Sequence, residues 1–197
     1  MVVSTTEISV VKEVLLDNIT PGYADIAANL SAEIRGYFDS HQHYRRLNTQ
    51  PMQVLLVHGA AGVGKSAIIE GATQSLPYPV IRGNLSEIVV NANGTESADE
   101  YVEQAFADLR ARASAAPMAV IVLDRVDVLA DRDLTQEMGK LSTQFLQFTS
   151  TLPASVFLIL ESTQPATSMS GSIKRSVALQ HALEVPVPTR PRREQIL

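Results

Sequence analysis

Short apolar runs alternate with longer amphipathic stretches along this chain. Three of the runs, at 54–57, 118–123 and 156–160, are apolar at every position. Such runs are typical of strands that are buried on both faces of a parallel sheet. The pattern also predicts a short strand at 80–82 and an edge strand at 183–187, since prolines there are tolerated only at a sheet edge.

The stretches between these runs carry apolar residues at helical spacing. They predict helices over about 30–46, from 67 to about 75, from Asp99 onward and over about 134–151. Ser31 is the expected N-cap of the first of these helices, and residues 91–98 are expected to form a polar loop. Because strands alternate with helices, the fold class is predicted to be α/β, with a parallel five-stranded sheet flanked by helices.

The chain is predicted to contain one domain and a short extension. Residues 1–21 are interpreted as an N-terminal extension or linker, because Thr20-Pro21-Gly22 interrupts the apolar pattern. Residues 22–197 contain all the predicted strands and form the domain. A chain of 197 residues with 45% hydrophobic residues is long enough for one buried core.

Composition narrows the functional classes. The net charge of −5 argues against nucleic acid as the main partner, because phosphate backbones recruit basic surfaces. There is no cysteine, which excludes disulfides and cysteine-based zinc sites. The N-terminus lacks the basic and apolar blocks of a signal peptide, and no apolar run approaches the roughly 20 residues of a membrane span. A membrane is therefore expected to be reached only through a protein partner.

The glycine-rich segment after the first apolar run carries the most specific chemistry. It follows the phosphate-binding pattern of Gly, four residues and Gly-Lys-Ser, over Gly59, Ala60, Ala61, Gly62, Val63, Gly64, Lys65 and Ser66. Glycines let the backbone curl so that several N–H groups turn inward, and the helix that opens with Ala67 directs its positive end at the phosphates. Lys65 is predicted to reach the β and γ oxygens and Ser66 to ligate Mg²⁺, so the expected cofactors are ATP and Mg²⁺.

Asp124 follows the most apolar run, at 118–123. A carboxylate at the C-terminal end of a central strand lies at the edge where ligands bind in open α/β sheets. With a phosphate-binding loop upstream, Asp124 is interpreted as the aspartate that holds Mg²⁺ through water. An ordinary cap at the end of a strand is the alternative interpretation.

Taken in order, these features resemble the large subdomain of an AAA ATPase. The matching segments are the phosphate-binding loop, Leu123–Asp127, Ser162–Pro165 and Glu184–Pro188, followed by Arg193 and Ile196. The resemblance implies a P-loop NTPase fold of the AAA+ type over 22–197, without the helical lid subdomain, as a fragment of a longer protein. It also implies that adenine is held by the segment Tyr23–Ala28, chiefly by Asp25, Ile26 and Ala27.

The departures from the family pattern concern hydrolysis. The family has an Asp-Glu pair whose glutamate activates the attacking water, whereas Arg125 follows Asp124 here. The asparagine that helps to orient this water corresponds to Thr163, and the arginine-finger position falls near 177–178. A further departure concerns the pore loop. The family normally has an aromatic residue before a glycine there, whereas the residues before Gly94 are not aromatic. The resemblance therefore predicts nucleotide binding with impaired hydrolysis.

This combination resembles the first, degenerate AAA domain of the peroxisome-biogenesis ATPases, of the peroxin-six type with peroxin-one close behind. The likeness rests on 119–129 and 179–186. It implies a hexameric ring with a paralogous AAA ATPase that extracts the import receptor from the peroxisomal membrane. The implied location is the cytoplasm, peripherally at that membrane.

Two other classes remain open from the residues alone. The chain could be a hydrolysis-competent P-loop ATPase of another AAA+ or STAND class that acts as a nucleotide switch. Its catalytic acid would then be Glu161, Asp127 or Glu70, with Glu161 favoured because it ends a strand next to the P-loop strand. The chain could also be a scaffold with a vestigial site, although an intact Gly-Lys-Ser argues against that reading.

Overall fold

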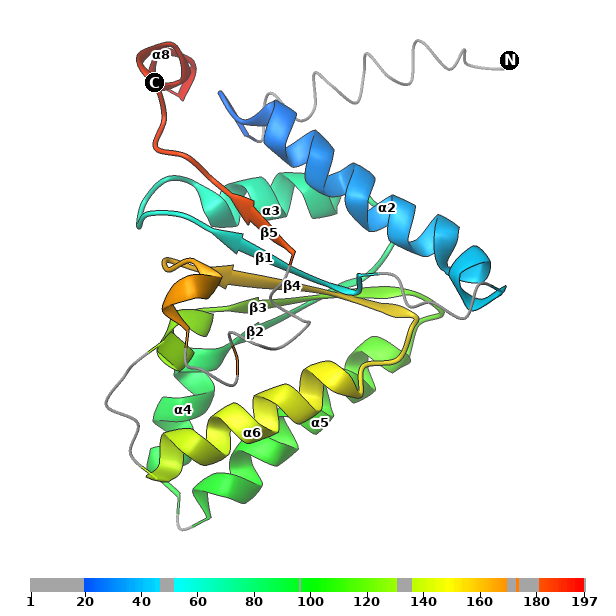
Figure 1. The fold of residues 1–197 in the computed structure, drawn as a ribbon, viewed down its shortest axis with the longest axis vertical. Helices are drawn as coiled ribbons and strands as arrows, with labels where there is room; N and C mark the ends of the chain where they lie inside the picture. Colours follow the sequence, from blue (N-terminus) through cyan, green and yellow to red (C-terminus); the bar gives the residue numbers. More distant parts are fainter. Residues whose placement is uncertain are drawn as a thin grey trace.

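The computed structural model describes residues 20–46, 52–95, 97–130, 136–169, 173 and 181–196. Within them, five strands form one parallel sheet in the order β2-β3-β4-β1-β5 (Figure 1). The strands are β1 Val54–His58, β2 Val80–Asn84, β3 Ala119–Asp124, β4 Val156–Ser162 and β5 Ala182–Glu184. The predicted α/β fold with a parallel five-stranded sheet is confirmed, and β5 is an edge strand as predicted.

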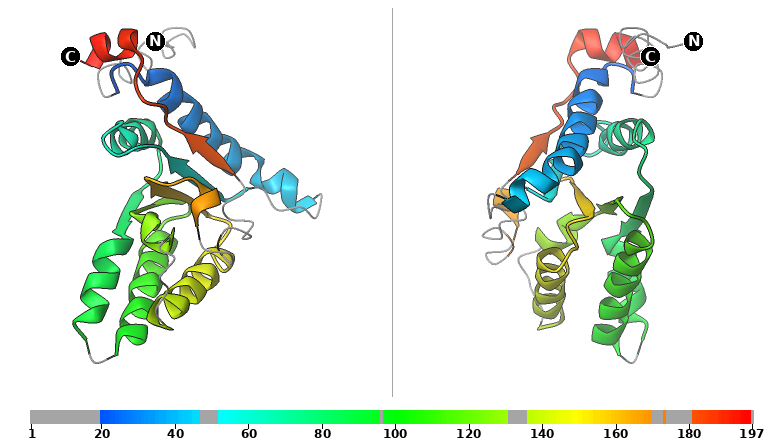
Figure 2. Two further views of the ribbon diagram at one scale, coloured as in Figure 1. Left: turned by 60° about the vertical axis from the view of Figure 1, so that its left-hand side comes forward. Right: turned by 90° about the vertical axis from the view of Figure 1, so that its right-hand side faces the viewer.

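Helices cover both faces of the sheet, as Figures 1 and 2 show. One face carries α2 and α3, the other carries α4, α5 and α6, and α8 lies beyond the end of β5. The helices are α2 Ala24–Arg46, α3 Lys65–Gln74, α4 Leu85–Asn93, α5 Ala98–Ser114, α6 Gln136–Ser150 and α8 Arg190–Ile196, with short 3₁₀ turns η1 Val126–Ala130 and η2 Ala166–Ser168. None of the described helices has the length and apolarity to span a bilayer.

The apolar strands divide their side chains between two core clusters. In β3, Val120 and Val122 belong to the cluster under α2 and α3, whereas Ile121 and Leu123 belong to the cluster under α4, α5 and α6. Successive side chains of a strand point to opposite faces, so a strand covered on both faces is apolar at every position. This is why the runs lack the alternation of a half-exposed strand.

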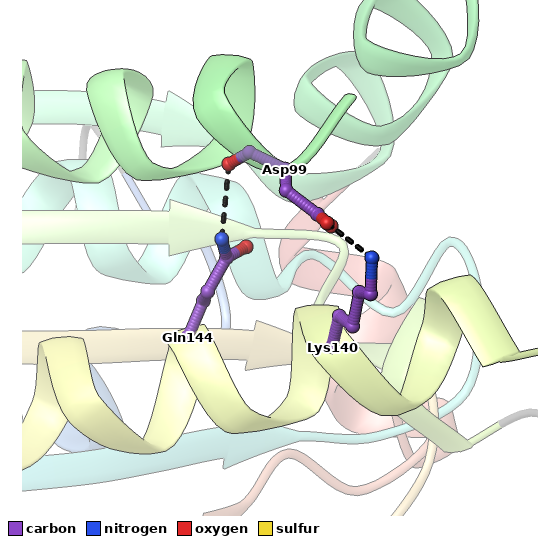
Figure 3. A network of polar contacts seen from close by, with 3 residues as sticks. All are labelled: Asp99, Lys140 and Gln144. Carbon is purple, nitrogen blue, oxygen red and sulfur yellow. Dashed lines mark hydrogen bonds and ion pairs between the residues drawn. The ribbon is translucent and has the colours of Figure 1, made fainter. Parts of the chain in front are cut away.

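The helices α5 and α6 are tied together at the start of α5. Figure 3 shows Lys140 in an ion pair with the carboxylate of Asp99, and the side-chain amide of Gln144 donating to the Asp99 backbone oxygen at 2.9 Å. Further along, the rings of Phe106 and Phe148 stack with centroids 4.7 Å apart. These contacts place both helices firmly on the far side of the sheet from α2.

The first predicted helix begins earlier than the pattern indicated. The prediction of a start near residue 30 is wrong, because α2 begins at Ala24. Ser31 is not an N-cap; it is fully buried inside the helix, and its hydroxyl donates to the Ala72 oxygen at 2.7 Å. Ser31 therefore fastens α2 to α3. The predicted extension at 1–21 lies outside the described residues except for Thr20 and Pro21.

The predicted polar loop at 91–98 is wrong in its first part, because α4 continues to Asn93. The start of α4 is capped by Asn84, whose side-chain oxygen accepts from the Glu87 N–H at 3.3 Å. An asparagine followed three residues later by a glutamate is a variant of the capping box. That local signal could have revealed the missed helix.

Candidate functional site

The glycine-rich segment 59–64 joins β1 to α3, and two of its glycines are required by the geometry. A Cβ atom on Gly59 would lie 2.4 Å from the backbone oxygen of Val185, so no side chain fits there. Gly64, the N-cap of α3, has a φ of 95°, a left-handed conformation that glycine adopts without strain. The loop therefore passes close to the end of β5 and turns directly into the helix.

The start of α3 is suited to an anion. No side chain caps this end of the helix, and its first turn contains no acidic residue. The N–H groups of the first turn have no partner within the helix and lie at the positive end of the helix dipole. This is the arrangement that binds phosphates at helix N-termini.

Lys65 folds over the loop that it follows. Its side chain is buried, and its ammonium donates to the backbone oxygens of Gly59 at 2.9 Å and Ala60 at 3.0 Å. These bonds use two of the three donors that an ammonium carries. The third donor can serve a phosphate oxygen in the adjoining cavity, which Lys65 lines.

Ser66 lies beside two carboxylates at the ends of neighbouring strands. Its hydroxyl donates to Glu161 Oε1 at 2.7 Å. Leu123 is in register with Leu160, so Asp124, the last residue of β3, and Glu161, the last but one of β4, lie at the same edge of the sheet. Ser66, Asp124 and Glu161 all line one cavity of about 300 Å³.

These oxygen donors fit Mg²⁺. Hydroxyl and carboxylate oxygens are its preferred protein ligands, and it is commonly held by one or two carboxylates together with substrate phosphates. Within the described part of the chain, no group of three or more His, Cys, Asp or Glu residues could hold a metal unaided. A metal here would therefore share its shell with the phosphates of the nucleotide.

Glu161 is a carboxyl in an unfavourable environment. Burial raises the pKa of the Glu161 carboxyl, and the nearby Asp124 carboxylate adds to the rise. The Ser66 hydrogen bond is the largest opposing effect on this pKa, followed by the charges of Lys65 and Arg82. The charged form of Glu161 is thus one that a bound cation would stabilise.

Arg125 has an unusual backbone at the edge of the cavity. Its φ of 59° is the one positive value among the described residues other than glycine, and its N–H donates to Asp124 Oδ1 at 2.6 Å. Left-handed backbone costs a residue with a Cβ about 1–2 kcal/mol. Arg125 thus lines the cavity directly after Asp124, the candidate metal-binding residue, with a positive charge and a strained backbone.

A second, apolar cavity of about 350 Å³ lies on the other side of the same loop. Gly62, Gly64 and Ala67 line both cavities, so both adjoin the same loop. The apolar cavity is lined by Thr20, Pro21, Tyr23, Gly62, Val63, Gly64, Ala67, Ile68, Pro188, Arg193 and Ile196. A polar cavity beside an apolar one fits a ligand with an anionic end and a flat apolar end, as a nucleotide has.

The three residues predicted to hold adenine do not line this cavity. Ile26 and Ala27 are buried in the core under α2 and α3. Asp25 is exposed and pairs with Arg192 at 2.9 Å. Of the predicted segment Tyr23–Ala28, Tyr23 lines the cavity, beside Thr20 and Pro21. Direct contact of Asp25, Ile26 or Ala27 with adenine stays a prediction.

Thr163 lies at the polar cavity, where the sequence placed the water-orienting position. Its backbone N–H donates to Asp127 Oδ1 at 3.2 Å, and Asp127 lines the cavity as well. Asp127 thus holds the loop after β4 in place. Glu70, the remaining candidate acid, is exposed on α3 and is not among the cavity residues. The predicted arginine-finger position at 177–178 lies outside the described residues.

The sheet order, the loop and the two cavities together define a P-loop nucleotide-binding protein. Comparison with known proteins narrows the class: the family described as "ATPase family associated with various cellular activities (AAA)" matches residues 55–186. This chain belongs to the AAA family, as its motifs predicted, and at the level of the family it is an ATPase.

A curated relative gives a second comparison. The chain is 25% identical over 157 residues to the 26S proteasome regulatory subunit 6B homolog of Encephalitozoon cuniculi (strain GB-M1). The alignment covers 75% of this chain and 38% of that relative, so the chain spans well under half of the relative's length. The narrower likeness to peroxisome-biogenesis ATPases is not supported by these comparisons and stays a prediction.

Proposed function

We propose that this chain is the ATP-binding module of a larger, ring-forming AAA ATPase, and that its nucleotide is held more than hydrolysed. The observation that carries the proposal is the contrast within one cavity. Lys65, Ser66 and Asp124 are present where phosphate and metal require them, whereas Arg125 stands where the family has its water-activating glutamate. The binding residues are kept, and the residue that follows Asp124 cannot act as a base.

Each residue has a role that follows from its placement. The start of α3 and the Lys65 ammonium bind the phosphates, and Ser66 with Asp124 holds Mg²⁺. Bound Mg²⁺ would neutralise phosphate charge. Arg125 cannot accept a proton from water, because a guanidinium stays protonated in proteins. Loss of a positioned base lowers a rate by about 10²–10⁴-fold.

The proposed ring rests on family membership and on the relative, which is named as a subunit of a proteasome regulator. A nucleotide that stays bound would keep the site rigid between neighbouring protomers, which we propose are paralogous AAA ATPases. Within this proposal, the residues at 119–129 and 179–186 support a role in peroxisome biogenesis, as receptor extraction from the cytoplasmic side of the peroxisomal membrane. Localisation and co-purification of the tagged full-length protein would test that assignment.

The proposed slow hydrolysis is tested by the fate of bound nucleotide. The purified chain is mixed with excess Mg·ATP, free phosphate is followed with time, and the nucleotide that remains after gel filtration is identified. We expect intact ATP on the protein and phosphate release far below the roughly 1–10³ per second of ordinary enzymes. Steady release within that range would overturn slow hydrolysis and support a competent nucleotide switch.

A further inference from the structure

Glu161 is a carboxylate that the family-based roles above leave without a function. Its side chain is 6% exposed, at the end of β4 between the P-loop strand and the strand of Asp124. Among the described residues, no basic nitrogen lies within 4.0 Å of its carboxylate, so no ion pair neutralises it. A buried carboxylate without such a partner is costly unless another cation arrives.

The geometry around Ser66 indicates where that cation would bind. Ser66, the residue placed to ligate Mg²⁺, donates its hydroxyl proton to Glu161 Oε1 at 2.7 Å. The present hydrogen bond also leaves the Ser66 lone pairs for a metal while Glu161 accepts the hydroxyl proton, which is how outer-shell groups orient a ligand.

We propose that Glu161 and Asp124 act as a two-carboxylate pair toward the Mg²⁺ of Mg·ATP and make nucleotide binding at this site depend on the metal. The inference rests on the proposed function, because it requires ATP in the same cavity. Asp124 is the position that the family pattern supplies, whereas Glu161 lies on the neighbouring strand, beside the serine that ligates the metal. Glu161 is thereby a positioning residue for the metal and not a base toward water.

The charges give the proposal a signature that a structural role would not produce. Without metal, two carboxylates face a triphosphate and repel it; with metal, they attract the cation that the phosphates share. Glu161→Gln is therefore expected to weaken binding of Mg·ATP and to strengthen binding of metal-free ATP. The ratio of the dissociation constant for metal-free ATP to that for Mg·ATP should fall about tenfold or more relative to the unaltered chain.

The test is calorimetric titration of ATP with Mg²⁺ and with EDTA into the unaltered chain and three variants. Glu161→Asp keeps the charge and is expected to keep most of the metal dependence, which separates charge from packing. Glu103→Gln makes the same chemical change on an exposed residue of α5 that lines neither cavity, and it should leave the ratio unchanged. Circular dichroism of each variant shows that the fold is retained.

The outcomes separate this inference from the proposed function. If the unaltered chain binds Mg·ATP and Glu161→Gln has the same ratio as the unaltered chain, the carboxylate pair is wrong and the proposed function stands. If Glu161→Gln keeps the ratio but abolishes phosphate release, Glu161 is the base that activates the attacking water, and the proposed carboxylate pair is overturned as well. Failure of the unaltered chain to bind ATP would overturn both.

Discussion

Arg125 joins two properties of this site in one residue: a cation where the family has an acid, and a left-handed backbone. The Arg125 N–H donates to Asp124 Oδ1 at 2.6 Å, and η1 begins at the next residue. Strain of this kind is commonly found at functional sites, where the surrounding structure holds it. At the residue scale, therefore, the site trades some stability for the position of Asp124.

Replacing Arg125 by glycine should stabilise the chain. Glycine relieves about 1–2 kcal/mol of left-handed strain and costs about 0.5–1 kcal/mol in added freedom of the unfolded chain, so the expected net gain is about 0–1.5 kcal/mol. Urea unfolding would measure the free energy. Arg125→Ala is the matched control, because its Cβ keeps the strain; equal stabilisation by both variants would show that the side chain, not the backbone, is responsible.

Glu161 should make the stability of the metal-free chain depend on pH. Its pKa is raised from the ordinary value of 4.5, so the folded state binds this proton more tightly than the unfolded chain. The contribution of Glu161 to stability is therefore fully present below pH 4.5 and is lost as pH rises through the raised pKa. Glu161→Gln removes this loss, so the free-energy advantage of the variant should grow from acidic to neutral pH in urea unfolding. An advantage that shrinks with rising pH would contradict the assigned direction.

At the scale of elements, the start of α2 and the segment after β5 close around the apolar cavity. The Tyr23 hydroxyl donates to the Pro186 oxygen at 3.0 Å, and the Arg192 guanidinium lies 5.0 Å from the centre of the Tyr23 ring. Arg192 also pairs with Asp25 at 2.9 Å. These contacts join α2 to α8 and form the wall of the apolar cavity, which we assign to the adenine of the nucleotide.

Two substitutions of Tyr23 separate the effect of its hydrogen bond to Pro186 from the effect of its ring in the cavity. Tyr23→Phe removes the hydrogen bond to Pro186 and should cost about 0.5–1.5 kcal/mol of unfolding free energy while keeping the ring in the cavity. Tyr23→Ala removes the ring as well and should in addition weaken ATP binding. Titration of ATP into both variants checks this; equal affinity in the two would show that the ring does not contact the nucleotide.

The sequence revealed elements to the extent that each had a local signal. The buried strands were predicted because Ala119–Leu123 and its counterparts are apolar on both faces, and the phosphate-binding loop because its chemistry fixes its residues. Helix α4 was missed, since only Leu85 and Ala92 in it are fully buried and its asparagines suggest a loop. The prediction of Ser31 as a cap is wrong because no local sequence pattern shows that α3 packs against this residue.

The site was predicted only as far as it is local in sequence. Lys65 and Ser66 follow from one motif, whereas the closeness of Ser66 to Glu161 depends on the order of strands in the sheet. Which residues of the segment Tyr23–Ala28 line the apolar cavity, Tyr23 rather than Asp25, depends on the exact start of α2. Such long-range relations need the fold and are not encoded in a short pattern.

At the scale of the whole molecule, the phosphate loop, the two strand-end carboxylates and the apolar wall gather at one edge of one sheet. This is the edge where parallel α/β sheets bind ligands. Family membership and the site geometry thus agree on a nucleotide, and the central claim is that Mg·ATP binds there through Lys65.

Calorimetric titration of Mg·ATP into the unaltered chain, Lys65→Ala and Lys140→Ala tests that claim most directly. Lys140→Ala truncates a lysine in an exposed ion pair on α6 that lines neither cavity, and such a pair contributes at most about 1 kcal/mol to stability (Figure 3). The predicted result is one site per chain, retained in Lys140→Ala and lost in Lys65→Ala. Unchanged binding in Lys65→Ala, or no binding to the unaltered chain, would contradict it.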